Sequence, residues 1–141
     1  MKINNNSTLK HNTVIIALGS NINVSINIPL AIESISKLGT ITNQTDCIVT
    51  TALNTPPGTK DYTNCALLLK TKLSLYEFIQ QLKTIEDQQG RIRSTINYHP
   101  VSIDLDVTTF NGVIVDRDFD KLPFLQDFVS ELQPELVNKS Q

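Results

Sequence analysis

Residues 102–115 read SIDLDVTTFNGVIV and carry the clearest strand and turn signals in the chain. Apolar and acidic residues alternate over residues 103–107, and this alternation predicts a strand, extending to residue 110, with one face in a hydrophobic core. Asn111-Gly112 is typical of the two-residue turn of a β-hairpin, and residues 113–115 can form the returning strand. The stretch therefore predicts a half-buried strand that continues into a tight hairpin.

The segment before this strand predicts a helix with a well-defined start. Ser74 and Glu77 have the spacing of a capping box, in which each side chain accepts a hydrogen bond from the other residue's backbone N–H. Apolar residues then form one helical face, at Leu75, Phe78, Ile79, Leu82 and Ile85. The helix is expected to end at Gln88-Gln89-Gly90, and residues 91–102 are expected to form the loop into the strand.

The other predicted elements surround this helix and strand. Further strands are expected at residues 13–18, 40–51 and 62–72, and further helices at residues 23–38 and 126–132. Gly19-Ser20-Asn21 is expected to end the first strand, and Gly39 to cap the first helix. The order β-α-β-β-α-β is that of a ferredoxin-like domain. We therefore expect an α+β, ferredoxin-like βαββαβ fold with an additional C-terminal hairpin strand and a short helix.

Composition and charge limit the class of protein. Of the 141 residues 40% are hydrophobic, so one domain with a core is expected at residues 13–141, after a frayed polar leader at residues 1–12. A formal charge of −2 without a basic stripe argues against a nucleic-acid partner. The longest apolar run, residues 14–18, is far shorter than the roughly 20 residues of a membrane helix. We expect a cytoplasmic monomer with neither a nucleic-acid nor a membrane partner.

The cysteines and histidines do not suggest a metal site. Cys47 and Cys65, together with His11 and His99, are too few and too widely spaced for a zinc site. Both cysteines lie in apolar, strand-like segments of the chain. We therefore expect both thiols to be buried.

Two acids in the predicted strand form a candidate metal site. Because side chains alternate along a strand, Asp104 and Asp106 should share the face opposite the apolar residues. Two neighbouring carboxylates repel each other unless a cation lies between them, and Mg²⁺ commonly binds one or two carboxylates together with phosphate oxygens. The alternative is an exposed strand face that carries two acids, which on spacing alone is the commoner case.

Two further groups of residues can bind ligands. Arg91 and Arg93 precede the acidic strand, and guanidinium groups bind phosphate oxygens bidentately; the alternative is a solvated loop with two surface arginines. Tyr62 and Asn64 are two positions apart on a predicted strand, so an aromatic ring and an amide face the same way. Such a pair can hold a flat heterocycle, although it also occurs on ordinary strand faces.

Four motifs in a fixed order extend these observations over most of the chain. They are ALGSN at 17–21, TPP at 55–57 with DYTN at 61–64, IEDQQGRIR at 85–93, and PVSIDLD at 100–106. Together they resemble the 6-hydroxymethyl-7,8-dihydropterin pyrophosphokinase family, and the resemblance extends from Thr13 onward. It implies a ferredoxin-like fold and ATP-dependent transfer of a pyrophosphoryl group to 6-hydroxymethyl-7,8-dihydropterin in folate biosynthesis, with release of AMP.

The resemblance also implies roles for individual residues. Asp104 and Asp106 would hold two Mg²⁺ ions with ATP, and together with Arg91 they are the expected catalytic residues. The expected ATP-binding residues are Glu86, Arg91 and Arg93. The expected pterin-binding residues are Thr55, Pro56, Tyr62 and Asn64.

Departures from the family pattern lie on the ATP side. Val101 stands where the family has an arginine, Phe124 stands where it has a histidine, and the stretch up to residue 132 is shortened. Two alternatives therefore stay open: a working diphosphokinase, which is a transferase, and a homologue that binds a pterin without turnover. A third, a ferredoxin-like interaction or nucleic-acid module, is disfavoured by the acidic charge balance and by the absence of aromatic RNA-stacking motifs.

Overall fold

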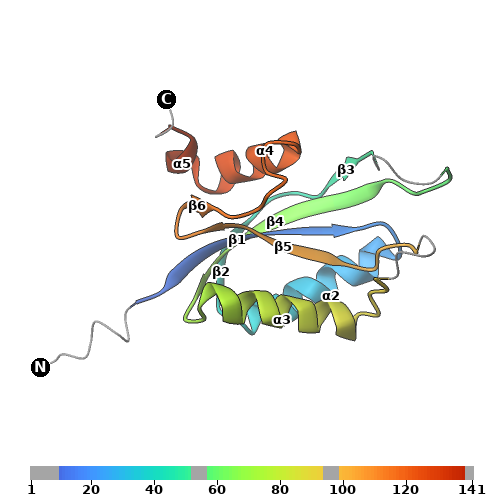
Figure 1. The fold of residues 1–141 in the computed structure, drawn as a ribbon, viewed down its shortest axis with the longest axis horizontal. Helices are drawn as coiled ribbons and strands as arrows, with labels where there is room; N and C mark the ends of the chain where they lie inside the picture. Colours follow the sequence, from blue (N-terminus) through green and yellow to red (C-terminus); the bar gives the residue numbers. More distant parts are fainter. Residues whose placement is uncertain (1–9, 52–56, 94–98, 139–141) are drawn as a thin grey trace, which may run out of the picture.

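The computed structural model describes residues 10–51, 57–93 and 99–138, in which helices cover both faces of an antiparallel sheet. The strands are β1 (Asn12–Ser20), β2 (Thr40–Gln44), β3 (Ile48–Thr50), β4 (Tyr62–Thr71), β5 (Asp104–Phe110) and β6 (Val113–Ile114). The helices are α2 (Val24–Ser36), α3 (Leu75–Gln88), α4 (Pro123–Leu132) and α5 (Pro134–Asn138). Figure 1 shows α2 and α3 on one face of the sheet and α4 and α5 on the other.

The strand order confirms the predicted α+β, ferredoxin-like fold. The strands lie side by side in the order β2-β4-β1-β5-β6, and β3 also pairs with β4. β1 is central because it pairs with both β4 and β5 in an antiparallel sense. α2 follows β1 and α3 follows β4, and both helices return to the same face of the sheet, as in a split βαβ arrangement.

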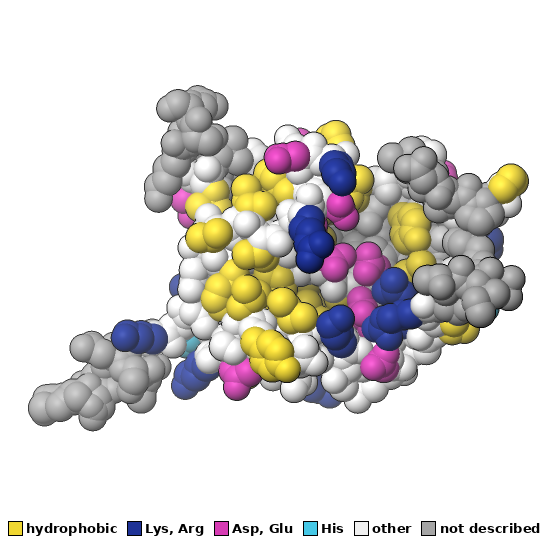
Figure 2. All heavy atoms as spheres, viewed as in Figure 1, with side chains coloured by type: hydrophobic (Ala, Val, Ile, Leu, Met, Phe, Trp, Pro, Cys, Tyr) yellow, Lys and Arg dark blue, Asp and Glu magenta, His cyan; other side chains and the backbone are white. Residues whose placement is uncertain are grey.

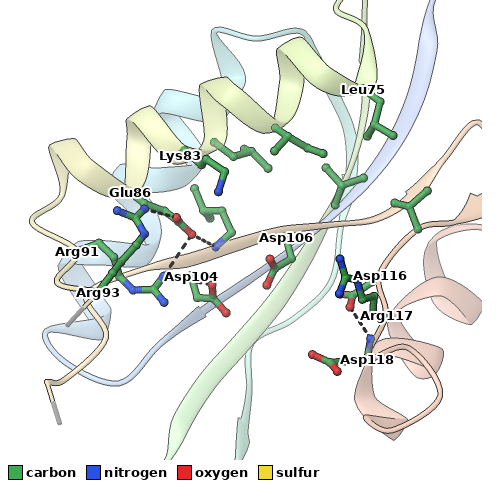
Figure 3. Close-up of a pocket in the computed structure, with 15 residues that line it drawn as sticks. Leu75, Lys83, Glu86, Arg91, Arg93, Asp104, Asp106, Asp116, Arg117 and Asp118 are labelled. Atoms are coloured by element: carbon green, nitrogen blue, oxygen red, sulfur yellow. Dashed lines mark hydrogen bonds and ion pairs between the residues drawn. The ribbon is translucent and has the colours of Figure 1, made fainter. Parts of the chain in front are cut away.

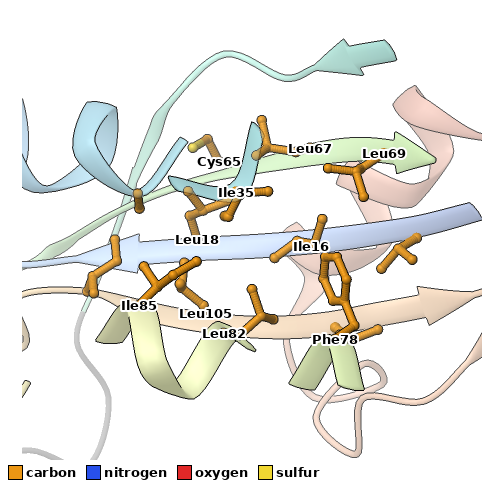
Figure 4. Packing of buried hydrophobic residues seen from close by; sticks show 14 of the residues in the cluster. Ile16, Leu18, Ile35, Cys65, Leu67, Leu69, Phe78, Leu82, Ile85 and Leu105 are labelled. Atoms are coloured by element: carbon orange, nitrogen blue, oxygen red, sulfur yellow. The ribbon is translucent and has the colours of Figure 1, made fainter. Parts of the chain in front are cut away.

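The central strand separates two hydrophobic clusters, because its side chains alternate between the two faces. Val14, Ile16 and Leu18 belong to the larger cluster, which β1, β4 and β5 form with α2 and α3 (Figure 4). Ile15 points the other way and packs with Leu125 and its neighbours on α4. Each buried aliphatic side chain contributes about 1.5–3 kcal/mol, so the two clusters fix the sheet between the two pairs of helices.

The prediction of one strand over residues 40–51 is wrong, because the structure divides this segment into β2 and β3. Thr45 lies buried between them, where its N–H donates to the carbonyl of Ala66 at 3.0 Å and its hydroxyl accepts from the N–H of Ala66 at 2.9 Å. The hydroxyl takes the place of a backbone partner, and the strand is interrupted there. Cys47 lies in this interruption and is exposed, so the expectation of buried thiols is correct only for Cys65.

Two glycines permit close approaches instead of ending elements as predicted. β1 continues past Gly19, where an added Cβ atom would lie 2.8 Å from Oδ1 of Asn64. α2 ends before Gly39, where an added Cβ atom would overlap the carbonyl oxygen of Lys70 on β4. At both positions the close contact with β4 is possible only without a side chain. These glycines are therefore required by the packing of distant segments.

The start of α3 and the C-terminal hairpin agree with the prediction. The N–H of Ser74 donates to Oε1 of Glu77 at 2.9 Å, and the N–H of Glu77 donates to Oγ of Ser74 at 3.1 Å, which completes the capping box. Asn111 and Gly112 have φ values of 52° and 81°, as a tight hairpin turn between β5 and β6 requires.

The C-terminal helices differ from the prediction in extent. α4 begins at Pro123 rather than at residue 126, because proline suits the first turn of a helix, where its missing N–H is not needed. α5, which was not predicted, follows directly after Gln133. None of the helices in the described part of the chain combines the length and the hydropathy that crossing a membrane requires.

Candidate active site

Asp104 and Asp106 lie on the face of β5 that is opposite the main core, as the alternation predicts. The intervening Leu105 and its neighbour Val107 are buried in the large cluster, so both carboxylates are directed to the other side. Both line one cavity of about 550 Å³ between α3, β5 and the segment after β6. Figure 3 shows the two carboxylates side by side at this cavity.

This cavity, which we call the acidic pocket, contains charges of both signs. Its carboxylates are Glu86, Asp104, Asp106, Asp116 and Asp118, and its cations are Lys83, Arg91, Arg93 and Arg117. Figure 2 shows acidic side chains with basic ones around them on this face of the molecule. The pocket thus has five carboxyl groups and four cations.

Glu86 connects the end of α3 to β5 and to the loop between them. Its side chain is only 7% exposed, and Oε2 accepts hydrogen bonds from the N–H of Leu105 at 2.7 Å and from Nη1 of Arg91 at 3.3 Å. Oε1 accepts from Nη2 of Arg93 at 2.6 Å. A buried carboxylate is costly unless it has such partners, so this network ties the loop firmly to the helix.

The two arginines of the loop are compensated by protein carboxylates. Nη1 of Arg91 also donates to Oδ1 of Asp104 at 3.2 Å, so Arg91 joins Asp104 to Glu86. Arg93 forms ion pairs with Asp87 and Glu86, and these two interactions raise the pKa of the guanidinium above its usual value. Arg91 and Arg93 therefore lie at the acidic pocket, as predicted, but with their charges already paired.

Asp106 ionises less readily than an ordinary aspartate. Desolvation in the pocket is the main cause, and the neighbouring charges of Asp104, Asp116 and Glu86 add to it; together they raise the pKa of Asp106 from 3.8 to about 8. A cation bound beside Asp106 would favour the ionised carboxylate. The electrostatics of the pocket therefore favour the binding of a cation.

The donor set of the acidic pocket fits Mg²⁺. This ion prefers hard oxygen ligands, and it commonly binds one or two carboxylates while phosphate oxygens and water complete its shell. Asp104 and Asp106 provide two such carboxylates on one strand face. Within residues 10–51, 57–93 and 99–138, no three His, Cys, Asp or Glu side chains are grouped to hold a metal ion by themselves.

A second cavity, of about 420 Å³, lies beside the acidic pocket. We call it the aromatic cleft, because Tyr62 and Asn64 of β4 line it together with Phe124 of α4. A small cavity of about 100 Å³, lined by Asn64, Asp104, Asp106 and Phe124 among others, lies between the two. Asp104 lines all three cavities and thus marks their junction.

The amide of Asn64 is held in a fixed position in the aromatic cleft. Its side chain is buried, and Nδ2 donates to Oγ1 of Thr50 on the neighbouring strand β3 at 2.6 Å. Oδ1 lies over Gly19, the residue of β1 that is paired with Asn64. The absence of a side chain at Gly19 therefore allows the amide to take this position.

Other residues singled out from the sequence lie outside the two cavities. Thr55 and Pro56 lie outside the described residues. Val101 is not among the residues that line the acidic pocket or the aromatic cleft. Its N–H donates to Oδ1 of Asn21 at 2.6 Å, and its carbonyl accepts from the N–H of Asn21 at 3.0 Å, so the backbone there is fixed to the segment after β1.

The structure also brings to the cavities Lys83 and Arg117, which the sequence did not single out, and Phe124, which the sequence places at a histidine position of the ATP side. Phe124 enters the aromatic cleft because α4 begins at Pro123, the residue before it. The Pro-Phe pair at a helix start is the sequence signal that could have identified it. Lys83 lies three positions before Glu86, on the same side of α3, which is a usable helical signal. For Arg117, between two acids after the hairpin, the sequence offered no signal.

Comparison with known proteins gives a consistent result. The model of the 7,8-dihydro-6-hydroxymethylpterin-pyrophosphokinase (HPPK) family matches residues 15–134. The chain is 29% identical over 112 residues to a 2-amino-4-hydroxy-6-hydroxymethyldihydropteridine pyrophosphokinase of Haemophilus influenzae, covering 75% of the chain and 67% of the relative. It is 33% identical over 67 residues to the protein of that name in Pseudomonas putida, covering 48% and 55%.

A third relative is much longer than the chain. The folic acid synthesis protein FOL1 of Dictyostelium discoideum is 27% identical over 146 residues, which covers 97% of the chain but 22% of the relative. The chain thus corresponds to one part of that protein.

Proposed function

Because the chain belongs to the 7,8-dihydro-6-hydroxymethylpterin-pyrophosphokinase family, we propose that it transfers a pyrophosphoryl group from ATP to 6-hydroxymethyl-7,8-dihydropterin in folate biosynthesis. In this reaction the hydroxymethyl oxygen of the pterin forms a bond to the β-phosphorus of ATP and loses its proton. The bond from that phosphorus to the oxygen that bridges to the α-phosphate breaks, and AMP leaves with this oxygen. The protein would thus be a diphosphokinase with two substrates.

The observation that carries this proposal is the position of Asp104 at the junction of two unlike cavities. One cavity is charged and fits a metal-bound polyphosphate, and the other is aromatic and fits a flat heterocycle. An in-line transfer requires the acceptor oxygen and the phosphorus to meet, so the two ligands must lie in adjoining sites. Asp104 lies where such ligands would meet.

The residues of the chain can divide the work of this reaction. Asp104 and Asp106 would hold Mg²⁺, which when bound supplies charge neutralisation of the phosphates. Arg91, bonded to both Glu86 and Asp104, fixes the direction of the Asp104 carboxylate. Most of the rate enhancement in phosphoryl transfer comes from positioning and from charge stabilisation, and the ion-pair network provides a rigid support for both.

On the pterin side, recognition would depend on stacking and on one amide. Tyr62 and Phe124 present aromatic side chains to the same cleft. Asn64, which is fixed by Thr50 and by the close approach to Gly19, can exchange hydrogen bonds with the polar edge of the ring. A site built in this way rejects ligands that lack matching polar groups, because the remaining hydrogen-bonding capacity of its buried amide would be left unused.

A second candidate function, pterin binding without turnover, has its own support. Arg91 and Arg93 are paired with carboxylates, and Val101 brings no charge to the acidic pocket. An arginine that stabilises the transferring group can be worth ~10³–10⁵ in rate. If no other cation compensates, the aromatic cleft would still bind a pterin while transfer was slow.

The activity can be tested by measuring AMP release from ATP in the presence of 6-hydroxymethyl-7,8-dihydropterin and Mg²⁺. We expect Asp104→Asn to lower this rate by ~10³-fold or more while the pterin still binds. Asp127→Asn, which removes an exposed carboxylate of α4, is the matched control and should leave the rate unchanged. Pterin binding by the wild-type chain without AMP release would favour the second candidate, and the absence of both would contradict the proposed function.

A further inference from the structure

The cations of the acidic pocket fall into two groups that differ in their partners. Arg91 and Arg93 account for all the ion pairs found within residues 10–51, 57–93 and 99–138. Lys83 and Arg117 line the same pocket, and neither forms a side-chain hydrogen bond or an ion pair with another described residue. Arg117 is unpaired although it lies between Asp116 and Asp118 in the sequence.

The two unpaired cations lie on different walls of the pocket. Lys83 projects from α3, and Arg117 projects from the segment that follows β6. Figure 3 shows Asp106 between them, with Glu86 and the two loop arginines on the side of Lys83. Both side chains are exposed, so they can reorient toward a ligand at little cost in desolvation. An anion held above Asp104 and Asp106 would therefore have a cation available on either side.

Charge balance separates the roles of the two groups. A guanidinium that is already paired with carboxylates adds little net positive potential, because its field is largely cancelled by its partners. A polyphosphate carries several negative charges and enters a pocket in which carboxyl groups outnumber cations. Besides Mg²⁺, it therefore needs cations whose charge is not compensated by the protein. Among the cations that line the acidic pocket, Lys83 and Arg117 meet this requirement.

From this arrangement, and resting on the proposed function, we propose that Lys83 and Arg117 bind the triphosphate of ATP from opposite walls of the acidic pocket. Together they supply the positive charge that Val101 does not bring to the site. Arg91 and Arg93, in this arrangement, mainly position Asp104 and the loop. Residues of α3 and of the segment after the hairpin thus bind the phosphates.

The test is a calorimetric titration of the full chain, at saturating Mg²⁺, with α,β-methylene-ATP, in which the bond that would break is blocked. We expect Lys83→Gln and Arg117→Gln each to weaken its binding by ~10-fold, and the double variant to weaken it further. AMP lacks the β- and γ-phosphates, so the affinity of the same variants for AMP should fall by less than about two-fold. The ratio of the two affinities is a readout that a purely structural defect would not change. Arg117→Lys, which keeps a cation, should recover most of the affinity.

Lys37→Gln is the matched control, because it removes one exposed positive charge at the end of α2, away from both cavities. An unchanged affinity in Lys37→Gln, together with losses in the pocket variants, would support the inference. Equal losses in all three variants would overturn it, since the effect would then follow net charge alone. Full affinity in the double variant, while the wild-type chain binds the analogue, would overturn the inference and leave the proposed function intact. No binding by the wild-type chain would contradict both.

Discussion

The aromatic cleft and the acidic pocket adjoin at Asp104, yet they are built in opposite ways. The cleft is formed by β4 and the start of α4, and its amide is already bonded to Thr50. The pocket is formed by charged side chains from α3, β5, a loop and the segment after β6, and its carboxylates repel one another. The cleft is therefore preorganised in the free protein, whereas the pocket reaches a favourable charge balance only when it binds cations.

This difference shows how one small sheet can provide two unlike sites. Hydrophobic packing fixes the cleft, because Phe124 packs edge-to-face on Phe128 of α4, with ring centroids 5.8 Å apart and planes at 72°. The charged side of the pocket depends on Glu86, whose buried carboxylate holds the loop arginines in place. Substitutions in one site should therefore leave the other largely intact.

The largest effect is expected from Glu86→Ala, which removes an acceptor shared by two arginines and the N–H of Leu105. We expect the free energy of unfolding to fall by about 2–4 kcal/mol, because removing one partner of a buried ion pair leaves the charges of the remaining partners less well compensated. Urea denaturation measures this change, and Glu33→Ala, on the exposed face of α2, is the control. Pterin affinity should persist in the folded variant. A loss below about 1 kcal/mol would contradict the central role given to Glu86.

A smaller effect is expected from Phe124→Ala, which removes one aromatic side of the cleft. Pterin affinity should fall by ~10-fold, because aromatic stacking and its buried area are lost, while nucleotide affinity should stay the same. Fluorescence titration with the pterin measures this change. Tyr76→Ala, which removes a 73% exposed ring on α3, should have no effect. Equal losses for both ligands would show that the two sites are not independent.

The smallest effect is expected from Asp106→Asn, and it depends on pH. The folded-state pKa of Asp106, about 8, lies above the ordinary value of 3.8, so the folded chain binds this proton more tightly than the unfolded chain does. The resulting stability is present below the ordinary pKa and is lost as the pH rises through the folded-state pKa. Because Asp106 stays in contact with solvent, the loss should be about 1 kcal/mol, or a few degrees in Tm.

Asp106→Asn cannot ionise and should therefore be more stable than the wild-type chain above pH 8, while the two should be alike near pH 4. Thermal unfolding without Mg²⁺ across this range measures the difference. The thermal stability of Asp127→Asn should vary with pH in the same way as that of the wild-type chain. A stability difference that does not vary with pH would show that the carboxyl of Asp106 is not held protonated by its surroundings.

Several features of the site followed from local sequence patterns. The alternation around Leu105 is sufficient to place Asp104 and Asp106 on one strand face, and the same rule places Tyr62 and Asn64 together on β4. The loop arginines could be expected near the acidic strand, because few residues separate them from it. Each of these relations depends on the geometry of a single strand or a short loop.

Other features could not be predicted from such patterns. The sequence predicts Arg91 and Arg93 as ATP-binding residues but does not show their pairing with Glu86, which α3 brings from an earlier segment. The pairing depends on the angle at which α3 packs on β5. The entry of Phe124 into the cleft likewise depends on α4 starting at Pro123 and packing on the second face of the sheet.

Local sequence patterns are sufficient for the βαββαβ order of the main elements, the start of α3, the tight hairpin and the shared face of the two aspartates. These properties arise from hydrogen bonds and side-chain directions among residues that are close in the chain. Tertiary packing sets which charges compensate one another, which aromatic ring completes the cleft, and why Gly39 must lack a side chain beside Lys70. Those properties depend on the distances between elements. The packing of the two hydrophobic clusters sets these distances, and no local sequence pattern encodes them.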